Sequence, residues 1–389
     1  MARLLKFLLI ARLKQRKTAG FTLIELLVAM IIAVLIMIPL MSLAVNLIDT
    51  DRREQAKSTS EQELQAAADF IARDLERAIY VYDAIALTTN NNATAANSGI
   101  RDQIPPVKPA PGCTDANLCQ PVLAFWTRRP VHEAVPSLDP QTRRSRNVNC
   151  STASDAVREA YCDDTFVYSL VVYYLILNNG EDKVWSNTAR IGRFELSDGV
   201  KNVDNVYLED VDPNSVKDGN KRDPGFVPFD LGLDESIRLS MNQWRSGNKD
   251  NNNQINAEAF DASSTVQVLV DYIDQTTIAD NNALPRTACP APVTNPQIPQ
   301  EGWIQSPYYG SQNPAPNPAP TSPPTDFQTY SFYSCINAEE GIVKLFLRGN
   351  AYARIQNRNN PGEWVDTITR RSFFPSTSVE VNAEGVINQ

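Results

Sequence analysis

The chain has 389 residues and a formal net charge of −9, from 36 Lys and Arg against 45 Asp and Glu. This length suits one elaborated domain or two small ones. The acidic balance argues against binding nucleic acid or anionic lipid through charge. The single histidine, His132, argues against histidine-based proton transfer and against a metal site with several histidine ligands.

The first predicted element is a long apolar segment at residues 21–48, in which Glu25 is the only charged residue. As a helix this segment would extend roughly 42 Å at about 1.5 Å per residue, enough to cross a bilayer core of roughly 30 Å. A carboxylate within it is costly, about 2.5–3.5 kcal/mol at the bilayer centre. We therefore predict a transmembrane and assembly helix in which Glu25 has a function.

Residues 1–20, which precede the apolar segment, form a leader with six Lys and Arg residues and no acid. A general secretory signal places its apolar core before the small-residue cleavage site, whereas here Gly20 precedes the apolar run. A plain membrane anchor would account for the length but not for Gly20-Phe21 or Glu25. Because basic flanks stay in the cytoplasm, we expect the remainder of the chain to face the periplasm.

The junction Lys17-Thr18-Ala19-Gly20-Phe21-Thr22-Leu23-Ile24-Glu25 resembles the class III signal of type IV prepilins and pseudopilins. The resemblance implies that residues 1–20 are cleaved off after Gly20 and that Phe21 is then N-methylated. It also implies that the Glu25 carboxylate pairs with the methylated amine of the first mature residue, its own or a neighbour's, during assembly. The alternative is a carboxylate that only reaches the membrane interface.

Residues 49–83 continue the helical pattern as an amphipathic segment. The apolar residues at helical spacing are Leu64, Ala67, Ala68, Ile71, Leu75, Ala78, Ile79 and Tyr82. No Pro or Gly interrupts residues 40–83. We therefore predict one helix that ends near Asp83, with a kink or frayed turn at Pro39. Residues 69–78 are similar to the same helix in large minor pilins and pseudopilins.

Residues 84–389 predict a β-rich domain with long insertions. The expected strands are 122–126, 166–177, 188–196, 264–273, 330–333, 341–355 and 377–381. A turn at 178–180, a loop at 128–149, a short helical stripe at 233–244 and a Pro-rich insertion at 285–325 complete the pattern. With the long helix in front, this order predicts an α+β fold and resembles the layout of pilins, which implies that the amphipathic half of the helix packs on an antiparallel sheet.

All six cysteines follow the membrane segment: Cys113, Cys119, Cys150, Cys162, Cys289 and Cys335. The periplasm permits disulfides. Proximity in sequence favours the pairs Cys113–Cys119, Cys150–Cys162 and Cys289–Cys335. Free buried thiols are the alternative.

One segment raises calcium as a candidate ligand. Asn248, Asp250 and Asn252 would supply oxygens at positions 1, 3 and 5 of a loop like that of an EF-hand. The pattern then fails, because Ala259 stands at the position of the last ligand, so an ordinary Asn-rich turn is the alternative. The sequence contains no HExxH, no GxSxG and no Gly-rich phosphate loop. We predict no enzyme and no other cofactor.

The resemblance implies a structural minor pseudopilin of a type IV pilus or of a fibre like that of type II secretion. Such a protein has one inner-membrane span, a cytoplasmic N-terminus and a periplasmic domain, and later enters a cell-envelope or surface fibre. Its implied partners are prepilin peptidase, other minor and major pseudopilins, and an inner-membrane assembly platform with its ATPase.

Two finer expectations concern polysaccharide. The chain's size, the Pro-rich insertion and residues 347–351 resemble most the pseudopilins of cyanobacterial hormogonium polysaccharide secretion, which implies a part in that secretion and in gliding motility. The alternative is a pilus-tip adhesin or carbohydrate-binding minor pilin. In that case Trp303, Tyr308, Tyr309 and the insertion around them would contact the polysaccharide.

Overall fold

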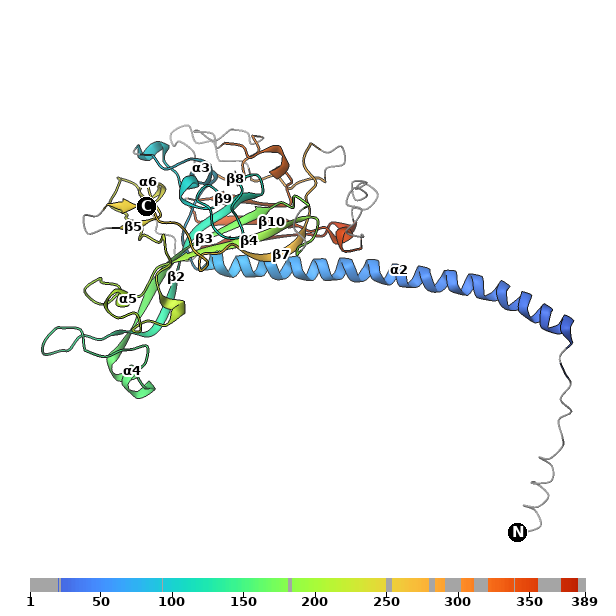
Figure 1. Ribbon diagram of the computed structural model, residues 1–389. Helices are drawn as coiled ribbons and strands as arrows, with labels where there is room; N and C mark the ends of the chain where they lie inside the picture. Colours follow the sequence, from blue (N-terminus) through green and yellow to red (C-terminus); the bar gives the residue numbers. More distant parts are fainter. Residues whose placement is uncertain are drawn as a thin grey trace, which may run out of the picture. The chain divides into compact units, whose positions relative to one another are not determined.

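The computed structural model describes residues 20, 22–92, 94–180, 184–249, 254–279, 284–290, 302–310, 321–338, 340–355 and 372–383 (Figure 1). The chain divides into two compact units, Met1–Glu54 and Gln55–Gln389.

The first unit consists, in its described part, of the beginning of helix α2 (Leu23–Glu76). Residues 23–48 are all exposed, although most of them are large and apolar. Among the described residues this is the one helix long and apolar enough to cross a membrane. The helix runs through Pro39 without a break, so the frayed turn predicted there is not formed.

The predicted end of α2 is wrong. The helix ends at Glu76, and Ala78–Val81 form strand β1, which pairs antiparallel with β2 (Cys119–Pro136). All four residues of β1 are buried, and the segment ends in the aromatic and β-branched residues that favour strands. Apolar residues at helical spacing continue across this boundary, so their periodicity alone could not place it.

A five-stranded antiparallel sheet forms the centre of the second unit. Its order is β1-β2-β3-β4-β7, in which β3 is Cys162–Ile176, β4 is Ala189–Ser197 and β7 is Gln267–Ile273. The central strand predicted at 166–177 corresponds to β3. The expected turn at 178–180 is instead part of a longer connection from Leu177 to Thr188.

The loop predicted at 128–149 is wrong over its first part, because β2 continues to Pro136 along β3. Figure 1 shows these two strands reaching beyond the rest of the sheet, with α4 (Asp155–Tyr161) and α5 (Leu208–Val211) beside them. Val131 and Val135 bury their side chains against Val167. The polar residues His132 and Glu133 between them, and the register shift at this point, hid the strand in the sequence.

A second sheet has the order β11-β10-β9-β8, also antiparallel throughout. Its strands are Ser376–Asn382 (β11), Ile342–Arg348 (β10), Phe332–Asn337 (β9) and Ile304–Ser306 (β8). Other described elements include the short helices α3 (Ala84–Thr88) and α6 (Ile237–Asn242) and the antiparallel pair of β5 (Asn248–Lys249) and β6 (Ile255–Asn256).

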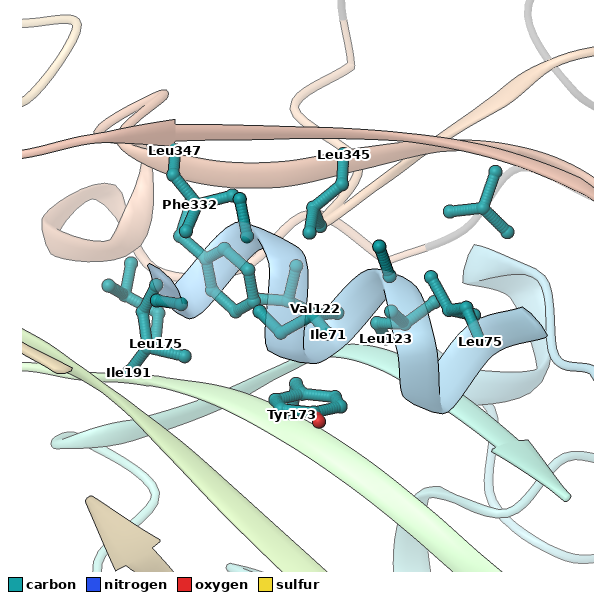
Figure 2. Packing of buried hydrophobic residues seen from close by; sticks show 14 of the residues in the cluster. Ile71, Leu75, Val122, Leu123, Tyr173, Leu175, Ile191, Phe332, Leu345 and Leu347 are labelled. Carbon is teal, nitrogen blue, oxygen red and sulfur yellow. The ribbon is translucent and has the colours of Figure 1, made fainter. Parts of the chain in front are cut away.

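The main core lies where the last turns of α2 contact both large sheets (Figure 2). Ile71 of α2, Tyr173 of β3 and Leu345 of β10 have no exposed surface. Burying apolar area of this kind is the main source of folding free energy. The α+β fold predicted from the sequence, with the amphipathic half of the helix on an antiparallel sheet, is confirmed.

Polar contacts fix α2 at its end on the five-stranded sheet. Asp74 Oδ2 accepts hydrogen bonds from the Tyr173 hydroxyl (2.7 Å) and from Arg193 Nε (2.8 Å). Arg193 also donates to Glu195 (2.6 Å). Burial raises the pKa of the Tyr173 hydroxyl, and the nearby Asp74 carboxylate raises it further. Tyr173 therefore stays protonated and acts as the donor to Asp74.

Candidate functional site

The N-terminal end of α2 carries the residues for which the sequence predicts processing and assembly. Thr22 caps this end: the Glu25 backbone N–H donates to the Thr22 carbonyl (3.1 Å) and to Thr22 Oγ1 (3.3 Å), and the Leu26 N–H donates to the same carbonyl (3.1 Å). Thr22-Leu23-Ile24-Glu25 therefore has the Thr-x-x-Glu spacing of a capping box. The Glu25 side chain also lies in the first turn, where the helix dipole favours negative charge.

This local role of Glu25 was missed from the sequence, although the four-residue spacing is a known signal for a helix start. The helix dipole favours the Glu25 carboxylate in the first turn of α2, and its side chain is exposed. Phe21, the predicted first mature residue, lies outside the described residues.

Gly20 is exposed, and among the described atoms a Cβ added to it would meet nothing within 4 Å. Its φ is not among the positive values that favour glycine. The local structure therefore does not require glycine at this position. A requirement for Gly20 would have to come from a protein that recognises the junction.

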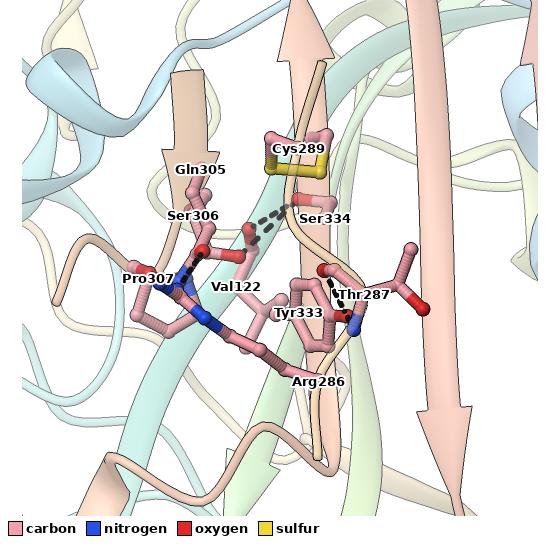
Figure 3. The surroundings of a disulfide bond; sticks show 10 residues. Val122, Arg286, Thr287, Cys289, Gln305, Ser306, Pro307, Tyr333 and Ser334 are labelled. Carbon is pink, nitrogen blue, oxygen red and sulfur yellow. Dashed lines mark hydrogen bonds between the residues drawn. A yellow bond between two sulfur atoms is a disulfide. The ribbon is translucent and has the colours of Figure 1, made fainter. Parts of the chain in front are cut away.

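Two of the three cysteine pairs favoured by sequence proximity are formed. Cys150–Cys162 joins the segment before α4 to the start of β3, with a Cα–Cα distance of 6.0 Å. Cys289–Cys335 joins the segment at 284–290 to β9, with a Cα–Cα distance of 5.5 Å (Figure 3).

The third pair, Cys113–Cys119, is wrong: both are free thiols, and both are buried. The Cys119 thiol instead donates to the Gly112 carbonyl (3.9 Å). Burial raises the pKa of the Cys113 thiol, and its contact with Cys119 raises it further. Cys113 is therefore expected to be unreactive while the domain is folded, because the thiolate is the reactive form. Cys119 is expected to be protected by its burial.

Alkylation followed by intact-mass measurement tests this assignment. Without reductant, iodoacetamide should leave the folded protein unmodified and should modify two thiols per chain after denaturation. With reductant and denaturant, all six cysteines should react. An unreduced, denatured chain that takes up no label would show that Cys113 and Cys119 are joined after all.

The candidate calcium ligands are only partly described. Asn248 lies in β5, where it pairs with Asn256 of β6, while Asp250 and Asn252 lie outside the described residues. The two strands are antiparallel, and Lys249 pairs with Ile255. Within the described ranges there is no group of three or more His, Cys, Asp or Glu side chains placed to hold a metal ion.

Two of the three aromatic residues expected to contact polysaccharide are buried. Tyr308 and Tyr309 are 5% and 8% exposed, and the Tyr309 hydroxyl donates to the Phe327 carbonyl (3.1 Å). Trp303 is half-buried, with Lys344 Nζ 5.0 Å from its ring centre. The two tyrosines belong to the interior, so contact with polysaccharide through them is wrong.

Comparison with known proteins places the N-terminal segment in a family. The family model of the prokaryotic N-terminal methylation motif matches residues 15–41, a range that includes Gly20, Phe21 and Glu25. No curated protein and no solved structure matches the chain. The methylation motif, the exposed apolar helix behind it and the α+β fold support a type IV pilin-like protein with a single membrane anchor.

Proposed function

We propose that this protein is a structural minor pseudopilin, processed after Gly20 and assembled into a type IV pilus or a fibre like that of type II secretion. The observation that carries the proposal is the methylation motif at residues 15–41, which directly precedes an apolar helix whose side chains are exposed from residue 23 to residue 48. Such a surface needs either lipid or other apolar helices around it. The membrane before assembly and a bundle of like helices after assembly would each supply that cover.

Glu25 would direct the position of each subunit. Cleavage after Gly20 creates a positive amine at residue 21, and N-methylation retains that charge. In an apolar fibre core, an unpaired carboxylate or ammonium is costly, whereas a pair is much less so. A subunit would therefore be favoured at the height where its Glu25 meets such an amine.

The orientation follows from charge. The leader carries six basic residues and no acid, so it would remain cytoplasmic while the Gln55–Gln389 unit is exported. The two disulfides of that unit suit an oxidising compartment. The implied partners are prepilin peptidase, an assembly platform with its ATPase, and major and minor pseudopilins.

The finer assignment to hormogonium polysaccharide secretion and gliding rests on the resemblance of the chain's size, its Pro-rich insertion and residues 347–351. The second candidate, a carbohydrate-binding tip subunit, would use the same anchor. Secretion and adhesion measured after deletion of residues 311–320, part of the Pro-rich insertion, would separate the two: a tip adhesin loses adhesion while secretion continues.

N-terminal mass mapping tests the proposed processing. In cells with active prepilin peptidase, the mature chain should begin at Phe21 with one added methyl group. Gly20→Val should retain residues 1–20 and yet fold normally, since a side chain at this position meets no described atom. A wild-type chain that still begins at Met1 in such cells would contradict the proposal.

A further inference from the structure

The outer face of the four-stranded sheet carries a pocket that the assembly function does not use. On β10 the residues Val343, Leu345 and Leu347 face the main core, so Phe346 faces the opposite side. Phe346 pairs across the strands with Tyr333 of β9 and with Ser378 of β11. The three side chains form a row on the outer face, at a cavity of about 290 Å³.

The row begins with two stacked rings. The ring centres of Tyr333 and Phe346 are 4.7 Å apart, and their planes differ by 8°. Tyr333 is 2% exposed, whereas Phe346 is only half-buried. Phe346 therefore presents aromatic surface to the cavity from a position that its stacked neighbour fixes.

One wall of the pocket is held in place by two contacts to β9 (Figure 3). The Tyr333 hydroxyl donates to the Thr287 carbonyl (2.8 Å) and accepts from the Thr287 N–H (3.2 Å). Two residues further on, Cys289 is disulfide-bonded to Cys335, which follows Tyr333 at the next position on the same face of β9. These contacts fix the segment that carries Arg286.

Arg286 supplies the positive charge of the pocket. Its guanidinium lies 4.6 Å from the ring centre of Tyr330, and Nη1 donates to Gln305 Oε1 (3.2 Å). Tyr330 has a φ of 51°, in the left-handed region that is unfavourable for a bulky residue. Such strain persists only where the surroundings enforce it, and here Tyr330 packs edge-on against both Tyr309 and Tyr333.

The charged side chains in the described lining of the cavity are all positive. Its described lining includes Arg286 and Arg348 but no Asp or Glu, in a chain with a net charge of −9. Arg348 is already paired with Asp274 (2.8 Å), so Arg286 is the cation available to a ligand. Ser376 and Ser378, which lie on the same face of the sheet as Phe346, line the side formed by β11.

We infer that this pocket binds an acidic saccharide, one sugar unit of a chain that carries carboxylates. The apolar face of a pyranose ring packs on an exposed aromatic face such as that of Phe346, while its hydroxyls need donors and acceptors of the kind that the β11 residues offer. A planar guanidinium binds a carboxylate through two parallel hydrogen bonds. The cavity is close to the lower limit of about 300 Å³ for small-molecule sites, which suits one or two sugar units.

This inference is independent of the proposed processing and assembly, and its test does not depend on them. The full chain in detergent micelles is titrated with a tetrasaccharide that alternates glucuronate and N-acetylglucosamine, and in parallel with chitotetraose, which is neutral. Binding is followed by calorimetry and by saturation-transfer NMR. We expect the acidic sugar to bind at least about tenfold more tightly than the neutral one, because a charge-assisted hydrogen bond is lost with the latter.

Arg286→Gln should weaken binding of the acidic sugar about tenfold and leave the neutral sugar unchanged. Phe346→Ala should weaken both. The matched controls are Arg128→Gln and Phe166→Ala, which change a similar cation–π pair (5.2 Å) on β2 and β3, outside the pocket. Neither control should alter binding.

Circular dichroism of each variant separates loss of the site from loss of the fold, and Phe346→Leu replaces the alanine variant if that one unfolds. Binding lost in Arg286→Gln but retained in Arg128→Gln supports the inference. Equal affinity for the two sugars, binding of apolar peptides in their place, or no binding of either sugar by the folded wild-type protein would overturn it.

Discussion

Asp274→Ala is expected to destabilise the folded Gln55–Gln389 unit by about 3–5 kcal/mol, the largest effect that we expect from a single substitution in it. Asp274 is fully buried at the end of β7, and Arg348 is 7% exposed at the end of β10. Arg348 Nε donates to Asp274 Oδ2 (2.8 Å) and its Nη2 donates to the Thr329 carbonyl (2.7 Å). Removing the carboxylate would leave a guanidinium buried beside β7 without its counter-charge.

The Asp274–Arg348 pair joins the two sheets. A small local rearrangement should therefore not bring the unpaired Arg348 guanidinium into contact with water. β7 is the last strand of the five-stranded sheet, and β10 is an inner strand of the four-stranded sheet. The Asp274 N–H donates to the Arg348 carbonyl (3.0 Å), and Ile273 forms a β-bridge with Gly349. Asp274 Oδ1 also accepts from the Thr276 N–H (3.0 Å) and hydroxyl (2.7 Å). The two sheets meet at this pair, so admitting water to Arg348 would require them to separate.

Urea unfolding of the full chain in detergent, followed by tryptophan fluorescence, measures the cost. The matched control is Glu380→Ala, which removes the exposed partner of Lys344 on the same sheet and should change the free energy of unfolding by about 0–1 kcal/mol. The double variant Asp274→Leu with Arg348→Met should be more stable than Asp274→Ala, because no buried charge then remains. If Asp274→Ala proved as stable as Glu380→Ala, the Asp274–Arg348 pair would not be important for holding the two sheets together.

The sequence predicted the elements whose apolar residues follow one period over a long stretch. Residues 166–177 predict a central strand because β-branched and aromatic residues fill both faces, and the stripe that includes Ile71 and Leu75 predicts the helix. Where a helical pattern and a strand pattern overlap, the sequence did not predict the boundary between the two elements. Ala78 and Ile79 continue the helical stripe and also fit a buried strand, and only the pairing of β1 with β2 decides between helix and strand.

Features that depend on strand register could not be predicted at all. Nothing in the sequence marks Tyr333 and Phe346 as neighbours. Their rings stack because the register of β9 and β10 places the two residues opposite each other. The same holds for Asp274 and Arg348, which lie 74 positions apart. Cys113 and Cys119 show the opposite error, since closeness in sequence suggested a bond that the fold does not form.

Glu25→Val is expected to leave membrane insertion and cleavage intact but to lower incorporation into the fibre by at least about tenfold. Insertion should become easier, because a carboxylate in the bilayer costs about 2.5–3.5 kcal/mol. Cleavage should continue, because Gly20 and the basic leader are unchanged. Assembly should suffer, because the amine of the first mature residue would then lack a counter-charge in an apolar fibre core, at a cost of about 3–5 kcal/mol when one partner of a buried pair is removed.

The capping contacts at the start of α2 provide the control that separates this account from a purely local one. Glu25 could matter only because its charge stabilises the first turn, a contribution of about 0.3–1 kcal/mol. Thr22→Ala removes the Thr22 Oγ1 contact to the Glu25 N–H (3.3 Å) and weakens the same turn by a similar amount while it retains the carboxylate.

Glu25→Gln retains the size and the polar side chain but removes the charge. Incorporation measured by immunoblotting of sheared fibres against the membrane fraction should therefore fall for Glu25→Gln and stay near the wild-type level for Thr22→Ala. If both variants lose incorporation equally, the carboxylate acts through the helix end and not through a neighbouring subunit.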